Sequence, residues 1–265
     1  MPVYTHQSHL FHYEDQGDAQ GRPAIVALPG MMSDSASWGP IAPALIAERR
    51  LLRPDPRCAG RSPVLPTSVE AVTADTIALL DHLGLAQVDL VSHSMGSRVA
   101  LDLAQRHPAR IRRMVLSAVM PRFPRINCAV FDSLLQIRKT SPGDGYLRAL
   151  FPWLFASPFF DDPARVEAAI AASLAYPHAQ TLDGMYHQVV ALKSGAPVQG
   201  MNLIDTPTLA LFATEDRLVP VTTAPGHLSD MPDCEVRIID GAGHALHWDQ
   251  PDTVARAMLD FLNVD

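Results

Sequence analysis

Short runs of consecutive apolar residues alternate along this chain with segments in which apolar residues recur at helical spacing. The apolar runs resemble strands that are buried on both faces of a sheet, and they lie at 23–28, 88–91, 114–119 and 208–213. Two further strands are expected at 50–53, where the signal is weaker, and at 234–239. Helices are expected at 37–46, 69–83, 98–106, 130–138, 164–175 and 252–262. Strands separated by helix-length segments form βαβ units. The pattern therefore predicts an α/β fold with a mostly parallel central sheet flanked by helices.

The first residues follow a different pattern. Polar and apolar residues alternate at 9–13, which predicts an edge strand that ends in a turn at 15–18. His6, His9 and His12 are spaced three residues apart. Side chains three apart on a strand point to opposite faces, so these histidines cannot easily chelate one ion together. The sequence therefore predicts no metal site.

The composition of the chain changes between residues 121 and 201, where proline and aromatic residues are concentrated and no strand is evident. A connection of this length without structure of its own is uncommon in a compact domain, and the segment is too apolar to be disordered. We therefore expect a helical lid at 121–201, inserted into a single α/β core that is formed by 1–120 and 202–265.

Composition and charge narrow the classes of partner. With 21 basic and 28 acidic residues the net charge is −7, which argues against a nucleic-acid surface. No apolar run approaches the ~18 residues of a membrane span, and the first residues lack the pattern of a signal peptide. Cys58, Cys128 and Cys234 form no C-x-x-C pair, so neither zinc nor a disulfide framework is predicted. We expect a soluble, cytoplasmic protein, and a homo-oligomer remains open.

One strand leads directly into a serine at a sharp turn. Residues 88–91 are followed by Ser92-His93-Ser94-Met95-Gly96 and then by a helical segment. A strand, a tight turn with a nucleophile at its tip and a helix make up a nucleophile elbow, whose residues two before and two after the nucleophile must be small. Ser92 and Gly96 meet that requirement. The pattern predicts that Ser94 is a nucleophile, although so short a motif also arises by chance.

An acid and a histidine follow later strands in the order that a Ser–acid–His triad requires. Glu215 and Asp216 come directly after the apolar run 208–213, and on their own sequence context either qualifies. His244 lies in a glycine-containing loop after the run 234–239. Order, placement at strand ends and flanking glycines therefore select Ser94, this acid pair and His244.

These motifs resemble those of the α/β-hydrolase fold superfamily, in particular its lidded esterases, C–C hydrolases and lactonases of the 3-oxoadipate enol-lactonase kind. S-H-S-M-G resembles the elbow, T-E-D-R-L-V-P the acid loop and G-A-G-H-A-L-H-W-D-Q-P the histidine loop. D-P-R-C-A-G-R-S is similar to the family's D-x-R-G-x-G-x-S loop, with Cys58-Ala59 in place of Gly-His. The family's acid stands four residues before a proline, which implies Asp216 rather than Glu215. Cys58 is expected near the mouth of the pocket as an inert side chain.

The resemblance also implies an oxyanion hole made by the backbone N–H groups of Met31 and Met95. The family's usual His-Gly before the first donor is replaced here by Pro29-Gly30, which keeps the donor but removes a histidine that braces the loop. Met31, Met32 and Met95 indicate either an apolar acyl pocket or ordinary core packing. The side chains expected to contact substrate are Met32, Trp153, Phe155 and Met185.

The sequence thus predicts a serine hydrolase without a cofactor that cleaves a small or medium, fairly apolar carboxylic ester or lactone. No G-x-G-x-x-G or G-K-[ST] motif follows a strand, so no nucleotide cofactor is expected. Relatives with an aspartate nucleophile, such as haloalkane dehalogenases and epoxide hydrolases, are excluded by the serine at position 94. Hydrolysis of a C–C bond in a diketone-like substrate and ligand binding on a hydrolase scaffold remain open.

Overall fold

Eight strands form one sheet among residues 2–19 and 21–264, which the computed structural model describes. The strands are β1 (Val3–His6), β2 (His9–Gln16), β3 (Ile25–Leu28), β4 (Leu51–Pro54), β5 (Val88–His93), β6 (Ile111–Ser117), β7 (Thr208–Ala213) and β8 (Cys234–Ile239). Their order across the sheet is β1-β2-β4-β3-β5-β6-β7-β8. All neighbours from β4 to β8 are parallel, whereas β2 is antiparallel to both β1 and β4. The predicted mostly parallel sheet is confirmed.

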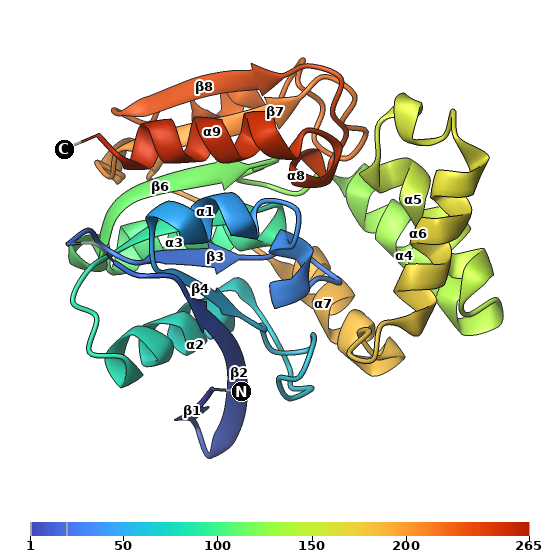
Figure 1. The fold of residues 1–265 in the computed structure, drawn as a ribbon, viewed down its shortest axis with the longest axis horizontal. Coiled ribbons are helices and arrows are strands. Elements are labelled where there is room, and N and C mark those ends of the chain that lie inside the picture. The colour runs from blue at the N-terminus through green and yellow to red at the C-terminus, as the bar shows by residue number, and fades with distance from the viewer. Residues whose placement is uncertain (1, 20, 265) are drawn as a thin grey trace.

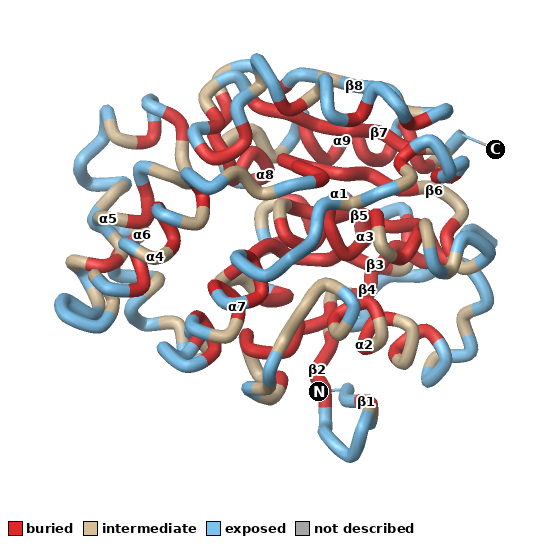
Figure 2. The backbone as a smooth tube through the Cα atoms, turned by 180° about the vertical axis from the view of Figure 1, so that it is seen from behind, coloured by how far each residue is buried: buried red, intermediate tan, exposed pale blue. Residues whose placement is uncertain are grey.

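Helices cover both faces of this sheet. They are α1 (Ala42–Glu48), α2 (Val69–His82), α3 (Met95–Arg106), α8 (Leu246–Asp249) and α9 (Pro251–Leu262). Helices α1 and α9 pack together on one face, and α2 and α3 pack together on the other (Figure 1). Every residue of β3, β5 and β7 is buried as a result, which explains why these strands are continuous apolar runs. Figure 2 shows this buried backbone running through the centre of the molecule.

The helix expected at 37–46 is wrong in its extent. The chain forms a 3₁₀ turn, η1 (Ser35–Trp38), and α1 begins only at Ala42. Gly39 and Pro40 separate the two, and Pro40 has no N–H with which to continue a helical ladder. Strand β1 was not expected, because four residues of mixed polarity carry little periodic signal.

The segment between β6 and β7 contains four α-helices and no strand within the described residues. We call residues 125–194 the helical insertion, and its α-helices are α4 (Arg125–Thr140), α5 (Asp144–Leu154), α6 (Pro163–Ala175) and α7 (Leu182–Ser194). The insertion lies beyond the carboxyl ends of the parallel strands, with α7 nearest the sheet (Figure 1). Helices were expected within α4 and α6 but not at α5, which contains Pro152, or at α7. None of the helices in the described part of the chain has the length and apolarity needed to cross a membrane.

The opposite end of the sheet is held by a buried ionic cluster. Asp89 on β5 is fully buried, and its carboxylate lies 2.5 Å from Arg49 Nη2 and 2.7 Å from Arg112 Nη2. Both arginines also donate to the carbonyl of Leu262 at the end of α9. One carboxylate therefore joins β5, β6, α9 and the end of α1. Removing one member of such a cluster leaves the others charged and without compensation.

We expect Asp89→Ala to lower the free energy of unfolding by about 3–5 kcal/mol, because it leaves Arg49 buried without its counter-ion. Urea denaturation followed by circular dichroism measures this change. Asp132→Ala is the matched control, since it removes an exposed carboxylate whose partner is Lys193 and should change stability little. Equal effects of the two substitutions would contradict the assigned role of the buried cluster.

Candidate active site

Ser94 occupies a strained turn between β5 and α3. Its backbone has φ +51° and ψ −113°, a conformation that residues other than glycine rarely adopt. The Ser94 N–H donates to Ser117 O at 2.8 Å, and the Ser94 carbonyl accepts from Ser97 N at 3.0 Å. The Ser94 side chain is partly exposed although its neighbours are buried. The turn therefore presents this hydroxyl at the carboxyl end of the sheet.

Gly96 allows the first turn of α3 to approach the end of β3. A Cβ atom at this position would lie 2.2 Å from Leu28 O and 2.6 Å from Pro29 O. At Gly30 a Cβ would lie 2.9 Å from His93 Nδ1 and 3.2 Å from Ser94 Cβ. The loop after β3 is thus packed directly against the turn at Ser94, and at Gly96 only glycine fits.

Ser92 stands where the family motif has glycine, and it meets the size requirement of the turn. The structure adds a second reason. Ser92 is fully buried, its hydroxyl donates to Val115 O at 2.8 Å, and it lies 3.0 Å from Ser97 Oγ. The hydroxyl is therefore hydrogen-bonded rather than merely tolerated.

Asp216 and His244 follow β7 and β8 and meet at the same end of the sheet. His244 Nδ1 lies 2.8 Å from Asp216 Oδ2, and both side chains are buried. The other carboxylate oxygen accepts from Leu218 N and Val219 N, each at 2.8 Å. These bonds fix the carboxylate, which in turn fixes the imidazole. With Nδ1 as donor to the carboxylate, Nε2 carries the lone pair that a general base needs.

Glu215, the other candidate acid, points to a different partner. Its carboxylate accepts from Ser157 N at 2.8 Å and from Ser157 Oγ at 2.5 Å. These hydrogen bonds hold the pKa of Glu215 below its ordinary value. Glu215 therefore joins the acid loop to the helical insertion, whereas Asp216 contacts His244.

Two further imidazoles surround His244. The ring of His93 lies 4.8 Å from that of His244 and 4.9 Å from that of His247, measured between ring centroids. His93 Nε2 is 2.9 Å from the carbonyl oxygen of His244, which can only accept, so this nitrogen donates. Burial lowers the pKa of His93 well below its ordinary value and lowers the pKa of His247 to about 3. Both rings are neutral near pH 7 and place no positive charge beside His244.

Two backbone amides close to Ser94 are free to bind an anion. Met31 lies in the loop after β3, and Met95 is the first residue of α3, where N–H groups have no intrahelical acceptor. Neither amide donates to another residue of the described chain. The next amide along, that of Met32, is bound by Gln188 Oε1 at 2.8 Å. The two free donors are those that the sequence predicts for an oxyanion hole.

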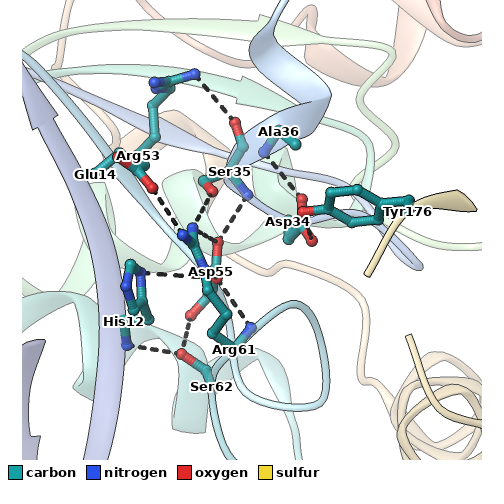
Figure 3. Close-up of polar contacts among 10 residues, drawn as sticks. All are labelled: His12, Glu14, Asp34, Ser35, Ala36, Arg53, Asp55, Arg61, Ser62 and Tyr176. Atoms are coloured by element: carbon teal, nitrogen blue, oxygen red, sulfur yellow. Dashed lines mark hydrogen bonds and ion pairs between the residues drawn. The ribbon is translucent and has the colours of Figure 1, made fainter. Parts of the chain in front are cut away.

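The loop with the D-P-R-C-A-G-R-S sequence is hydrogen-bonded to the segment that follows β3. Asp55 Oδ1 accepts from Ser35 N at 3.0 Å, and Asp55 Oδ2 accepts from Arg61 Nε at 2.8 Å (Figure 3). Burial opposes ionisation of Asp55, but the bonds from Arg61 and Ser35 outweigh it and lower the pKa. Beside this network, Tyr176 Oη of the insertion donates to Asp34 Oδ2 at 2.8 Å (Figure 3). The motif thus fixes the backbone that follows β3.

The histidine loop is also bonded to the helical insertion. Asp249 Oδ2 accepts from Gly243 N at 2.8 Å and from Ala156 N at 3.0 Å, and Ala245 N donates to Leu154 O at 2.8 Å. A Cβ at Gly243 would lie 2.7 Å from Ala156 N, so the two segments are in close backbone contact. The position of His244 therefore depends on the insertion.

The side chains expected to contact substrate each pack against other residues of the protein. Met185 is completely buried, with Sδ 3.5 Å from Arg138 Nη1. Phe155 stacks on Phe159 at 4.2 Å between ring centroids within a small aromatic cluster of the insertion. Trp153 is partly buried against the main hydrophobic core.

Met95 borders two cavities, one between α2, α3 and the end of α7 and one between β1, α2 and the loop after β4. Neither cavity is lined by Met32, Trp153, Phe155 or Met185. These four assignments therefore remain predictions. Ser94 and His244 do not line these two cavities either.

Cys58 does not lie at a pocket mouth, because it is buried and its Sγ donates to Leu65 O at 2.8 Å. Its φ of +70° explains why the family motif has glycine there. Gln180 Nε2 donates to Cys58 O at 2.7 Å, a contact that the sequence did not predict. The sequence does offer a sign that Gln188 is buried. This polar residue lies at helical spacing between the buried residues Met185 and Leu192.

Comparison with known proteins places this geometry in context. The sequence model of the alpha/beta hydrolase family matches residues 25–257. The Agrobacterium fabrum protein named "Putative carbamate hydrolase RutD" is 27% identical over 260 residues, which cover 95% of this chain and 97% of that protein. MGS-M2, an alpha/beta hydrolase enzyme from a Medee basin deep-sea metagenome library, aligns with a TM-score of 0.90 at 25% identity, covering 100% of this chain and 98% of that one. The enol-lactonase from Burkholderia xenovorans LB400 shares the fold, with a TM-score of 0.88 at 23% identity over 99% of this chain and 100% of that one.

The neutral His247 predicts a defined loss of stability in acid. Its folded-state pKa of about 3 lies below that of an unfolded histidine, so only the unfolded chain takes up the proton as the pH falls below about 6.5. This uptake favours unfolding. Removing the His247 imidazole should therefore reduce the slope of the unfolding free energy against pH by about 1 kcal/mol per pH unit between about pH 6 and pH 4. Urea titrations of wild type and His247→Phe measure the slopes. His227→Phe, at an exposed histidine, should leave the slope unchanged; an unchanged slope in His247→Phe would refute the assignment.

Proposed function

Because this chain belongs to the alpha/beta hydrolase family and is a hydrolase, we propose that it cleaves small or medium, fairly apolar carboxylic esters or lactones with Ser94, His244 and Asp216 as a catalytic triad. The observation that carries the proposal is the 2.8 Å contact between His244 Nδ1 and Asp216 Oδ2, at the end of the sheet where the strained turn presents Ser94. A buried histidine oriented by a buried carboxylate beside an accessible serine is the arrangement that activates a hydroxyl for acyl transfer.

Ser94 Oγ attacks the carbonyl carbon of the substrate while His244 Nε2 accepts the hydroxyl proton. Asp216 stabilises the imidazolium that forms. The Met31 and Met95 amides donate to the tetrahedral oxyanion, and each such donor contributes about 3 kcal/mol to transition-state stabilisation. His244 then returns the proton to the leaving alkoxide, which leaves an acyl ester on Ser94. Water, deprotonated by His244, attacks this ester and releases the acid and Ser94.

The neighbours of the triad support this chemistry. Neutral His93 and His247 add no like charge when the His244 imidazolium forms, so its cost is not raised by adjacent cations. We take the helical insertion as a lid at 121–201 over a core made of 1–120 and 202–265. In this proposal the lid and the loop after β3 supply the substrate contacts, including Met32, Trp153, Phe155 and Met185.

A carbamate is a second candidate substrate. The relative named "Putative carbamate hydrolase RutD" aligns over nearly the whole of both chains, and a carbamate carbonyl is open to the same attack by Ser94. The reaction would differ only in the intermediate, a carbamoyl rather than an acyl group on the serine. Esters remain the first candidate because Met31, Met32 and Met95 favour an apolar acyl group.

We expect a fluorophosphonate probe to label the wild-type protein and not Ser94→Ala, since the probe phosphonylates an activated serine. Mass spectrometry of the intact protein and of its peptides measures the stoichiometry and the site. A wild-type protein that stays unlabelled would refute Ser94 as the nucleophile and favour a ligand-binding scaffold.

The same preparation, tested on p-nitrophenyl esters, lactones, aryl carbamates and vinylogous diketones, ranks the substrate classes. Ester or lactone turnover should be the fastest. Efficient carbamate or diketone cleavage beside negligible ester and lactone turnover would replace the proposed substrate class.

Asp216→Asn should lower kcat by up to about 10⁴-fold, because the amide no longer stabilises the imidazolium or selects the required tautomer. Glu215→Gln is the matched control, and kcat should remain within a few-fold of wild type, since that carboxylate binds Ser157 rather than His244. Steady-state kinetics on the best ester decide between the two. A larger loss in Glu215→Gln would show that the acid is assigned wrongly.

A further inference from the structure

Two glutamines of the helical insertion bond to the loops around Ser94. Gln188 on α7 accepts the Met32 N–H through Oε1 at 2.8 Å. Gln180, which precedes α7, donates Nε2 to the same Oε1 at 2.9 Å and to Cys58 O at 2.7 Å. The pair therefore connects the loop after β3 to the loop after β4 through one shared amide oxygen.

Both residues held by this pair have strained backbones. Met32 has φ +59° and Cys58 has φ +70°, in the left-handed region where residues with a side chain are uncommon. Such conformations persist only where surrounding contacts determine them. Tyr146 of α5 adds another contact, with Oη 2.9 Å from Met32 Sδ. The insertion thus holds Met32 by its backbone and by its side chain.

The pair is retained at a cost in stability. Gln188 is completely buried and Gln180 nearly so, yet Gln188 Nε2 and Gln180 Oε1 have no partner within the described chain. A buried polar group without a partner destabilises the folded protein, whereas an apolar side chain would fill the same space without that cost. Packing alone therefore does not explain the glutamines, and their directed hydrogen bonds remain as the reason.

We propose that Gln188, supported by Gln180, is a positioning residue that couples docking of the helical insertion to the oxyanion hole. The bond to Met32 N–H fixes the peptide plane that follows Met31. This constraint holds the loop so that the Met31 N–H stays free to donate to the tetrahedral oxyanion beside Ser94. The inference rests on the proposed function, and it adds a residue from the insertion to the machinery of that site.

The oxyanion exists in the transition state and not in the bound substrate, so the loss of Gln188 should appear in kcat rather than in KM. Loss of a whole donor costs about 10²–10³-fold, and a misplaced donor costs less. We expect Gln188→Leu to lower kcat by about tenfold or more, with KM within about twofold of wild type. Gln188→Glu should recover much of this loss, since a carboxylate oxygen still accepts from Met32 N–H.

These values are measured with the best ester and divided by the number of sites titrated with the fluorophosphonate probe, which removes any contribution from unfolded protein. Gln136→Leu, at an exposed glutamine of α4, is the control and should match wild type. Gln180→Leu tests the same chain of bonds if Gln188→Leu does not fold. It should lower kcat in the same direction by a smaller factor.

Hydrogen exchange of the Met32 amide, read by NMR on protein labelled with ¹⁵N-methionine, tests the loop without turnover. We expect exchange about tenfold or more faster in Gln188→Leu than in wild type, Gln188→Glu or Gln136→Leu. Equal Met32 exchange in all four proteins overturns the inference, and so does faster exchange with unchanged kcat. If the wild type turns over no substrate, the proposed function fails, while Met32 exchange still decides whether Gln188 holds the loop.

Discussion

The close approach of α3 to the end of β3 at Gly96 is the contact on which the site depends. Because a Cβ there would lie 2.2 Å from Leu28 O, the helix and the loop after β3 can meet only with glycine at this position. That contact brings the loop that carries Met31 against the first turn of α3, which carries Met95. It also helps to enforce the strained backbone of Ser94, which would otherwise relax.

The helical insertion is bonded to three of the loops that carry site residues. It reaches the loop after β3 through Gln188, the acid loop through Ser157 and the histidine loop through Ala156. Because these hydrogen bonds are direct, displacing the insertion would also disturb the loops that carry the site residues. The loop after β3 is therefore held both by the Asp55 network and by the insertion, whose Tyr176 donates to Asp34 beside that network (Figure 3).

Buried charges differ between the reacting end of the sheet and its opposite end. Buried ion pairs lie away from the reacting groups, as at Asp89 on the far part of β5, where they hold strands and helices together. The buried titratable groups next to His244 include the Asp216 carboxylate and two imidazoles, those of His93 and His247, which burial keeps neutral. The local field thus comes from Asp216 and from backbone amides, which suits a transition state that carries an imidazolium and an oxyanion.

The sequence by itself determined the parts that leave a local signal. The fully buried β7 is a continuous apolar run, whereas β8 is a partly exposed strand that contains Glu235 and Arg237. Both strands were predicted at their observed bounds, and their ends located Asp216 and His244. Helix α7 was missed because its buried face includes a glutamine. The choice between Glu215 and Asp216 needed a family motif until the structure showed their separate partners. Only the tertiary structure decided that Gln188 binds Met32, since hydrogen bonds between residues so distant in the chain leave no periodic trace in the sequence.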